Sequence, residues 1–236
     1  MHIEIKGMIE SSFLDWDGKI VSTLYVPHCN FRCPFCHNWE LVTHPEKFDA
    51  KPFDEIKAFL TENRNFIDGI CLTGGEPALY SDLIEYSKKI KDLGMMVKLD
   101  TNGSVPKMIE KVFDQDLINY IAMDIKAPLE QMAYNKLAGV KVNLGNIKKT
   151  IELIMNSGVD YEFRTTVVPT WLTNENILDI AKSIEGAKKY VLQQFVPEHA
   201  FSEDLRSFKP YGKEKIDAMI EVGNKYVEKM IARGLK

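Results

Sequence analysis

The chain of 236 residues lacks the features that mark several classes of protein. No apolar run approaches the ~20 residues of a membrane-spanning helix, and residues 1–7 have no apolar segment of the kind found in a signal peptide. The net charge of −4 argues against a general binder of nucleic acid or of membrane surfaces. We therefore expect a cytoplasmic protein that binds neither nucleic acid nor membrane.

Cysteine is also scarce, and its distribution is uneven. The chain has four cysteines, of which Cys29, Cys33 and Cys36 lie close together, whereas Cys71 stands alone. Three thiols at these spacings can converge on one point from a single loop, which indicates a metal or cluster site in a reducing compartment. Three ligands would leave one iron of a four-iron cube without a protein ligand, and an open coordination position is where chemistry takes place.

The cysteine spacing alone leaves two other interpretations open. A zinc site would combine the three thiols with His28, His37 or His44 as the fourth ligand. Residues 33–36 also form a CxxC sequence, which is typical of a reactive dithiol. The pattern of the remaining chain has to distinguish these sites from an iron–sulfur cluster.

Apolar patterns predict strands that alternate with helices. We expect strands at 19–26, 67–72, 96–99, 120–125, 161–168 and 190–195, after a short strand at 3–10. We expect helices at 53–64, 81–93, 106–113, 129–137, 144–156, 175–185 and 213–232. The six strands from 19–26 to 190–195, which alternate with helices, favour an α/β fold with a parallel sheet rolled into a partial (βα)6 barrel. The periodicity does not distinguish this barrel from a doubly wound sheet. We expect a single domain over 1–236, with its core at about 19–196 and a closing helix at about 213–232.

Polar residues follow the predicted strands at one end. In parallel α/β barrels the reactive residues cluster at the carboxyl ends of the strands. After the cysteines, the later strands bring Gly74-Gly75-Glu76-Pro77, Asp100-Thr101-Asn102-Gly103, Asp124 with Lys126, Arg164, and Gln193-Gln194. All six strands thus carry polar groups at the same open end of the predicted barrel, its mouth. This coincidence is stronger evidence for a functional site than any single motif.

Each of these sets also has an ordinary structural interpretation. Two glycines before Glu76 let backbone approach a ligand closely, but a bare Gly-Gly is usually a tight turn. Asp124 and Lys126 are two residues apart and face the same side of a strand, where they form either a ligand site or a solvated ion pair. An Asn-Gly pair is strong turn chemistry, so Asp100 is the member of its set that most favours function. Arg164 either points into the mouth or lies near the edge of its strand.

The motifs together resemble the radical S-adenosylmethionine (SAM) superfamily. The Cx3Cx2C spacing followed by Gly-Gly-Glu-Pro carries this resemblance. Cys36-His37-Asn38, the set at 100–103, Asp124-Ile125-Lys126, and Arg164 near Val167-Val168-Pro169 narrow it to the activating proteins of glycyl radical enzymes. The short type that activates anaerobic ribonucleoside-triphosphate reductase has the nearest pattern, and the pyruvate formate-lyase activating type is related.

The resemblance implies a role for each matching residue. Cys29, Cys33 and Cys36 would hold a [4Fe–4S] cluster, whose free iron takes the amino and carboxylate groups of SAM. The residues expected at SAM are Phe35 and His37 beside the adenine; Gly74, Gly75 and Glu76 at the methionine amino group; Asp124 and Lys126 at the ribose and carboxylate region; Arg164 at the carboxylate; and Asp100 and Asn102 in the same cofactor-binding set.

Two further details come from the resemblance alone. In the formate-lyase type, the positions that match Asp100, Thr101, Ala122 (by its carbonyl) and Asp124 surround a monovalent cation, and we consider such a cation here. A family histidine at the end of the last strand falls on Val196 of this chain, and His199 lies nearby but out of register. The sequence leaves open whether His199 takes that role.

The implied activity is the reductive cleavage of SAM to a 5′-deoxyadenosyl radical, which would generate a glycyl radical on a partner such as anaerobic ribonucleotide reductase. A flavodoxin or ferredoxin would supply the electron. One alternative is a radical SAM enzyme that acts on a small molecule, similar to 7-carboxy-7-deazaguanine synthase. An alternative of another class is a zinc-binding interaction module without catalysis.

Overall fold

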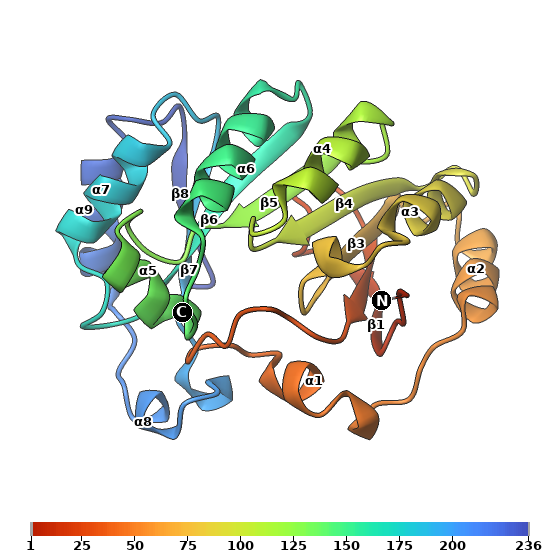
Figure 1. Ribbon diagram of the computed structural model, residues 1–236, viewed down its shortest axis with the longest axis horizontal. Coiled ribbons are helices and arrows are strands. Elements are labelled where there is room, and N and C mark those ends of the chain that lie inside the picture. The colour runs from red at the N-terminus through yellow and green to blue at the C-terminus, as the bar shows by residue number, and fades with distance from the viewer. Residues whose placement is uncertain (1, 236) are drawn as a thin grey trace.

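One sheet of eight strands runs through residues 2–235, the residues that the computed structural model describes (Figure 1). The strands are β1 (Gly7–Ser12), β2 (Val21–Val26), β3 (Gly69–Gly74), β4 (Met96–Thr101), β5 (Tyr120–Asp124), β6 (Asp160–Val167), β7 (Tyr190–Gln194) and β8 (Met230–Arg233). They stand in the sheet in chain order. β1 is antiparallel to β2, and every later pair of neighbours is parallel. Positions 1 and 236 of the predicted domain lie outside the described residues.

Helices connect the strands and cover the outside of the sheet. The α-helices are α1 (Trp39–Thr43), α2 (Phe53–Glu62), α3 (Leu83–Lys91), α4 (Pro106–Asp114), α5 (Gln131–Ala138), α6 (Leu144–Asn156), α7 (Asn174–Ser183), α8 (Glu203–Arg206) and α9 (Lys213–Gly223), with 3-10 turns η1 (Pro45–Lys47), η2 (Pro77–Leu79) and η3 (Pro197–His199). In Figure 1, α2, α3, α4, α6, α7 and α9 follow one another around the curved sheet.

The order of the strands distinguishes the two predicted architectures. A doubly wound sheet reverses its strand order at a switch point. Strands in simple chain order, joined by right-handed crossovers, instead place their helices on one face of the sheet. The order β1 to β8 has no reversal in residues 2–235, so the predicted barrel-type α/β fold is confirmed.

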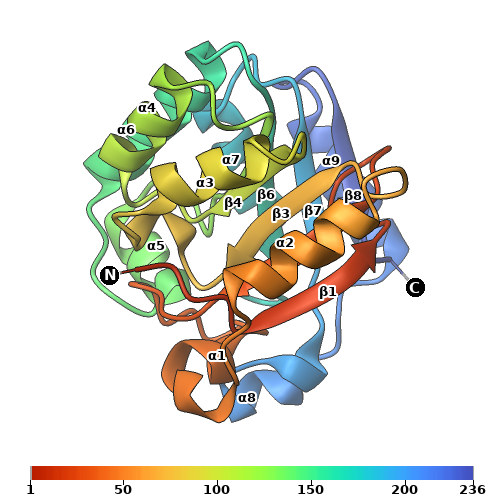
Figure 2. The ribbon, with the colours of Figure 1, turned by 90° about the vertical axis from the view of Figure 1, so that its right-hand side faces the viewer.

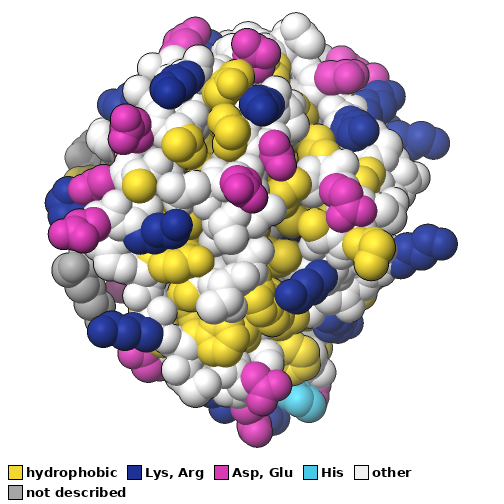
Figure 3. Space-filling model, turned by 90° about the vertical axis from the view of Figure 1, so that its left-hand side faces the viewer, with side chains coloured by type: hydrophobic (Ala, Val, Ile, Leu, Met, Phe, Trp, Pro, Cys, Tyr) yellow, Lys and Arg dark blue, Asp and Glu magenta, His cyan; other side chains and the backbone are white. Residues whose placement is uncertain are grey.

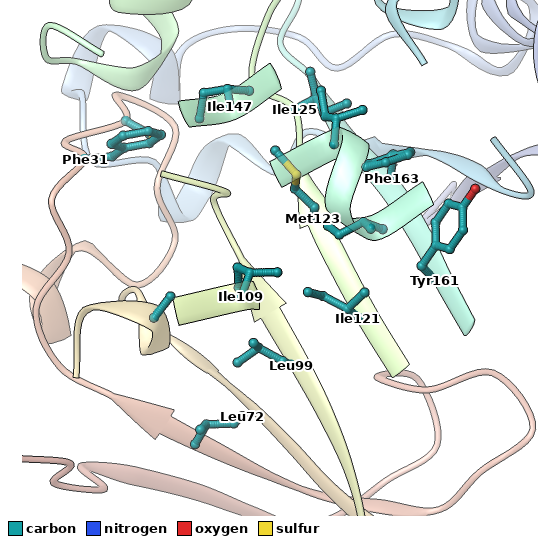
Figure 4. Close-up of a cluster of buried hydrophobic side chains, with 14 of the residues drawn as sticks. Phe31, Leu72, Leu99, Ile109, Ile121, Met123, Ile125, Ile147, Tyr161 and Phe163 are labelled. Carbon is teal, nitrogen blue, oxygen red and sulfur yellow. The ribbon is translucent and has the colours of Figure 1, made fainter. Parts of the chain in front are cut away.

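Alternation along each strand separates an apolar outer face from a polar inner face. On β4, Val97 and Leu99 belong to the hydrophobic core, whereas Lys98 and Asp100 form an ion pair on the other face. Figure 4 shows the core between sheet and helices, with Leu72, Leu99, Ile121 and Phe163 from the strands and Ile109 and Ile147 from α4 and α6. Burial of each such side chain contributes roughly 1.5–3 kcal/mol, so the core fixes the strands and leaves the inner face for polar groups.

The C-terminal region corrects one prediction. The expected helix over 213–232 ends at Gly223, and the chain then returns as β8, which pairs with β7. The Asn224 side chain accepts a hydrogen bond from the Met230 backbone amide (3.0 Å), which closes the turn between helix and strand. The apolar residues after Gly223 fit the spacing of a helix as well as that of a strand. The Gly-Asn pair at 223–224 is the sequence signal for the end of the helix, and the continuing apolar pattern obscured it. The sheet therefore has β1 and β8 in addition to the six predicted barrel strands.

Short segments near the carboxyl ends of the strands close the lower part of the molecule. Figures 1 and 2 show both α1 and α8 at this end of the molecule. The Trp39 ring of α1 lies 5.6 Å from the Phe201 ring (between centroids), and the Arg206 guanidinium of α8 lies over Trp39. These contacts join the segment after β2 to the segment after β7, so the first and last parallel units meet at the mouth.

The side of the molecule that carries α7 and α9 has a mixed surface. Figure 3 shows Lys and Arg side chains interspersed with Asp and Glu, with hydrophobic side chains between them. Within residues 2–235, no helix has the length and apolarity needed to cross a bilayer.

Candidate active site

A cavity of roughly 370 Å³ opens at the carboxyl ends of the strands. Its lining includes the three clustered cysteines and all ten of the predicted SAM-binding residues: Phe35, His37, Gly74, Gly75, Glu76, Asp100, Asn102, Asp124, Lys126 and Arg164. Thr101 also lines it, whereas Ala122 is buried within β5 and lies opposite Asp100 in the sheet register. The structure thus brings together residues that are spread over more than half of the sequence.

The cysteine loop is fixed by backbone contacts to distant segments. The Arg32 amide donates to the Ala138 carbonyl at the end of α5 (2.8 Å), and the Ser202 amide donates to the Pro34 carbonyl (2.8 Å). Within the loop, the Cys36 amide donates to the Cys33 carbonyl (3.0 Å). These contacts hold the three thiols at the cavity before any ligand binds.

The environment of the three thiols keeps them protonated at neutral pH. Burial raises the pKa of Cys29 to about 12 and that of Cys33 to about 11, and it also raises the pKa of Cys36. A thiol becomes a metal ligand only as the thiolate, so metal or cluster binding here has to displace protons. This environment disfavours the free reactive dithiol, because reactivity requires a lowered pKa.

Glu76 joins the loop after β3 to the loop after β4. Its buried carboxylate accepts hydrogen bonds from the Ala78 amide (3.0 Å), the Thr101 hydroxyl (2.8 Å) and the Asn102 amide (2.5 Å). Burial raises the pKa of Glu76 to about 7, although these hydrogen bonds act in the opposite direction. The sequence suggested only a ligand contact for Glu76, and the structure adds this link between two loops.

Arg164 bridges two carboxylates at the floor of the cavity. Its Nε lies 2.8 Å from Asp124 Oδ1, and its Nη1 lies 2.9 Å from Asp100 Oδ2. Lys126 Nζ lies 2.9 Å from Asp124 Oδ2, and Lys98 Nζ lies 2.7 Å from Asp100 Oδ1. Of the two positions that the sequence allowed for Arg164, the structure shows the one inside the mouth.

The acidic and basic groups of this network stabilise one another in their charged forms. Burial alone would raise the pKa of Asp124, but Arg164 and Lys126 lower it to about 2. The pKa of Asp100 is also lowered, against the effect of burial, by Arg164 and Lys98. The pKa of Lys98 is raised in spite of burial because Asp100 stabilises its charge. Lys98 also belongs to this network, although its place in the sequence does not mark it as a residue of the site.

The histidines near the last strand occupy different places. His37 Nε2 donates to the Val196 carbonyl (3.1 Å), so the backbone of Val196 orients a ring that lines the cavity. His199 packs against His37, with 6.0 Å between ring centroids, and is not among the residues that line the cavity. His199 therefore lies against His37, outside the lining of the cavity.

Comparison with known proteins decides the family. The profile described as the radical SAM superfamily matches residues 23–187. The chain belongs to the radical SAM superfamily.

Relatives and solved structures agree with this assignment. A Methanocaldococcus jannaschii protein, provisionally named a glycyl-radical enzyme activating enzyme, is 30% identical over 97% of this chain and 95% of its own. A pyruvate formate-lyase-activating enzyme of Clostridium pasteurianum is 25% identical over 94% of each chain. The crystal structure of Streptococcus suis SuiB matches with a TM-score of 0.69 at 16% identity over 89% of this chain, which spans about half (48%) of that structure. The last similarity concerns the fold alone.

The radical SAM family implies a [4Fe–4S] cluster and SAM, and the donor set fits the cluster. Three thiols from one loop line the cavity, whereas Cys71 is buried within β3. In residues 2–235, no group of three His, Cys, Asp or Glu side chains is placed to hold a single metal ion. A four-iron cube sets its thiolates farther apart than the ~4 Å found between thiolates around one zinc ion. Membership of this enzyme family decides against the non-catalytic zinc module.

Gly75 gives a first test of how this radical SAM enzyme holds its cysteine loop. A Cβ at Gly75 would lie 1.8 Å from the His28 carbonyl oxygen, directly before Cys29. We expect Gly75→Ala to lower the free energy of unfolding by about 1–3 kcal/mol, because backbone has to move, and to reduce the iron bound per chain. Urea unfolding and iron analysis after anaerobic reconstitution measure both effects.

Gly7→Ala is the matched control for this prediction. A Cβ at Gly7 meets Tyr25 at an ordinary contact distance of 3.5 Å, so we expect a change within about 0.5 kcal/mol and full iron content. Full iron content and unchanged stability in Gly75→Ala would contradict the role given to this close contact.

Proposed function

We propose that this radical SAM enzyme activates a glycyl radical enzyme by taking a hydrogen atom from a glycine of that partner. The observation that carries the proposal is the cavity that joins the three thiols to the polar ends of the parallel strands. Similarity to a provisionally named activating enzyme over 97% of this chain, and to a pyruvate formate-lyase-activating enzyme over 94%, supports this function. When bound, the cluster supplies the electron that cleaves SAM into methionine and a 5′-deoxyadenosyl radical.

The residues of the cavity would bind and orient SAM. In this proposal Cys29, Cys33 and Cys36 hold the cluster. Phe35 and His37 flank the adenine, and Gly74, Gly75 and Glu76 bind the methionine amino group. Asp124 and Lys126 bind the ribose and carboxylate region, and Arg164 binds the carboxylate, with Asp100 and Asn102 supporting them.

The ion-pair network suits a carboxylate ligand. Lys126 and Arg164 both line the cavity and both keep their positive charge, since the pKa of each is raised by neighbouring carboxylates in spite of burial. Cationic side chains held in place before binding attract and orient an anionic group at little cost in reorganisation. The network would therefore fix the methionine end of SAM relative to the cluster.

The proposed enzyme requires a protein substrate and an electron donor. We take anaerobic ribonucleotide reductase as the glycyl radical enzyme, a flavodoxin or ferredoxin as the electron donor, and the cytoplasm as the compartment. A cavity at the open end of the sheet suits a substrate that arrives as a loop of another protein.

The direct test is the formation of a glycyl radical. Anaerobically reconstituted enzyme, reduced flavodoxin, SAM and the glycyl radical enzyme encoded nearest its gene are mixed and frozen for electron paramagnetic resonance. We expect a radical signal on the partner, and its hyperfine splitting should collapse when the partner is labelled with deuterated glycine. The same mixture without SAM is the control.

A different result would assign another function to this enzyme. Turnover of a purine-like small molecule, with no radical on the partner protein, would contradict the activating role and support the alternative similar to 7-carboxy-7-deazaguanine synthase.

A further inference from the structure

Three of the four residues predicted to surround a monovalent cation are already engaged by side chains or backbone groups of the chain. Lys98 and Arg164 take the two Asp100 oxygens, at 2.7 and 2.9 Å. Arg164 and Lys126 take the two Asp124 oxygens, at 2.8 and 2.9 Å. Each carboxylate is thus paired on both of its oxygens by side-chain cations.

Of the other two predicted ligands, the Thr101 hydroxyl is engaged as well, and Ala122 would contribute its backbone carbonyl. The Thr101 hydroxyl donates to Glu76 (2.8 Å) and accepts from the Gly103 amide (3.1 Å). Ala122 lies in the middle of β5, paired with Asp100 of β4 on one side and with Glu162 of β6 on the other. The predicted ligand set therefore does not fit a monovalent cation in this structure.

The charge balance points in the same direction. Lys98, Arg164 and Lys126 carry three positive charges against the two negative charges of Asp100 and Asp124. A further cation between Asp100 and Asp124 would lie next to three ammonium or guanidinium groups, where like charges repel each other strongly because water is largely excluded. The Lys126 and Arg164 side chains, which line the cavity, instead complement an anion such as the SAM carboxylate.

Lys98 is the residue that distinguishes this ion-pair network from a site that holds a monovalent cation. It is 1% exposed, does not line the cavity, and reaches Asp100 from beneath. Its Nζ also lies 3.8 Å from Cys71 Sγ and 5.8 Å from the centre of the Tyr120 ring, so its position is fixed by contacts on several sides. A buried lysine that is this well packed keeps a permanent charge beside Asp100.

We propose that Lys98 and Arg164 replace the monovalent cation, so that this enzyme binds SAM without one. Lys98 is then a positioning residue: it holds Asp100, which holds Arg164 toward the SAM carboxylate. The inference rests on the proposed binding of SAM at this cavity. Loss of the Lys98 ammonium should then make SAM binding depend on a monovalent cation.

The first experiment measures SAM binding to the reconstituted, unreduced enzyme by equilibrium dialysis. The buffer contains either potassium chloride or tetramethylammonium chloride at the same ionic strength, since tetramethylammonium is too large for the site. We expect the wild-type dissociation constant to change by no more than about twofold, the scatter of a site without an ion ligand. A wild-type affinity that falls tenfold or more on removal of potassium, about 1.4 kcal/mol, would overturn the inference.

Two substitutions at Lys98 separate charge from volume. Lys98→Ala removes the charge and leaves space, so we expect weak SAM binding in tetramethylammonium that potassium restores. Lys98→Met removes the charge but fills the space, so we expect weak binding in both salts. Lys188→Met is the matched control, because Lys188 pairs with Asp160 at the surface, away from the cavity, and we expect wild-type behaviour.

A second measurement does not depend on SAM. Thallium-205 resonance detects binding of the thallous ion, which resembles potassium, to the reconstituted enzyme. We expect no saturable site in the wild type and one potassium-displaceable site in Lys98→Ala; a saturable wild-type site lost in Asp100→Asn would overturn the inference. With the expected thallium result, absence of SAM binding in either salt would contradict the proposed function and leave the ion replacement supported.

Discussion

Replacing Cys33 with alanine should reduce SAM cleavage to the uncatalysed background. Only three thiolates are available to the cluster, and Cys33 is the most buried of them, with 7% of its surface exposed. A cube held by two thiolates loses its low potential and its fixed place beside SAM. We expect less than the full complement of about four irons per chain and no 5′-deoxyadenosine above the level without enzyme. Iron analysis and chromatography of the products after reduction measure both quantities.

Cys71→Ala is the matched control for the cluster ligands. Cys71 is fully buried on β3, where it packs with Trp16 and Val21 away from the three cavity thiols. Its replacement removes a small side chain and should cost about 1 kcal/mol of stability, with iron content and SAM cleavage retained. Cys29→Ala and Cys36→Ala should behave like Cys33→Ala. Full activity in Cys33→Ala would exclude the three-thiolate cluster site.

Replacing Arg164 with methionine should cause the largest loss of stability among the residues of the cavity floor. The substitution removes the partner of two carboxylates at once, on a side chain that is only 9% exposed. Breaking a buried ion pair on one side typically costs about 3–5 kcal/mol, because the remaining charge stays desolvated. Lys98 and Lys126 still compensate part of that charge, so we expect about 3 kcal/mol. Urea unfolding at neutral pH gives this value, and equilibrium dialysis should show weaker SAM binding.

Two further variants make the Arg164 result specific. Lys188→Met removes a surface pair with Asp160 (3.9 Å), and we expect no more than about 1 kcal/mol. In Arg164→Met, Asp124 keeps Lys126 and Asp100 keeps Lys98. A second change of Asp124 to Asn would leave the Lys126 ammonium without its carboxylate and should therefore lower the stability further. If Arg164→Met costs no more than Lys188→Met, Arg164 does not neutralise the floor of the cavity.

The sequence predicted the parts of this protein that depend on local pattern. The helix over 144–156 was placed at its observed bounds, since the aligned Ile147, Ile151 and Ile154 and the following Gly158 define it. The six barrel strands were placed within a few residues, because each is an apolar run bounded by turn residues. Their polar ends then predicted which side chains line the cavity.

The sequence did not reveal which polar residues support the cavity from below. Lys98 lies between Val97 and Leu99, and a strand that is buried on both faces gives no local sign of which face looks inward. The ion pair to Asp100 depends on the curvature of the whole sheet, as does the Arg164 bridge between strands. The link from Glu76 to the loop after β4 has the same origin, since it joins residues about 25 positions apart.

The backbone contacts of the cysteine loop have a consequence for the order of events during synthesis. Each strand lies beside the one made just before it, so successive units can dock as the chain leaves the ribosome. The cysteine loop is different, because its contacts run forward to Ala138 and Ser202. The loop therefore emerges early but reaches its final shape only after most of the polypeptide has been made. Delivery of iron and sulfide would then follow translation rather than accompany it.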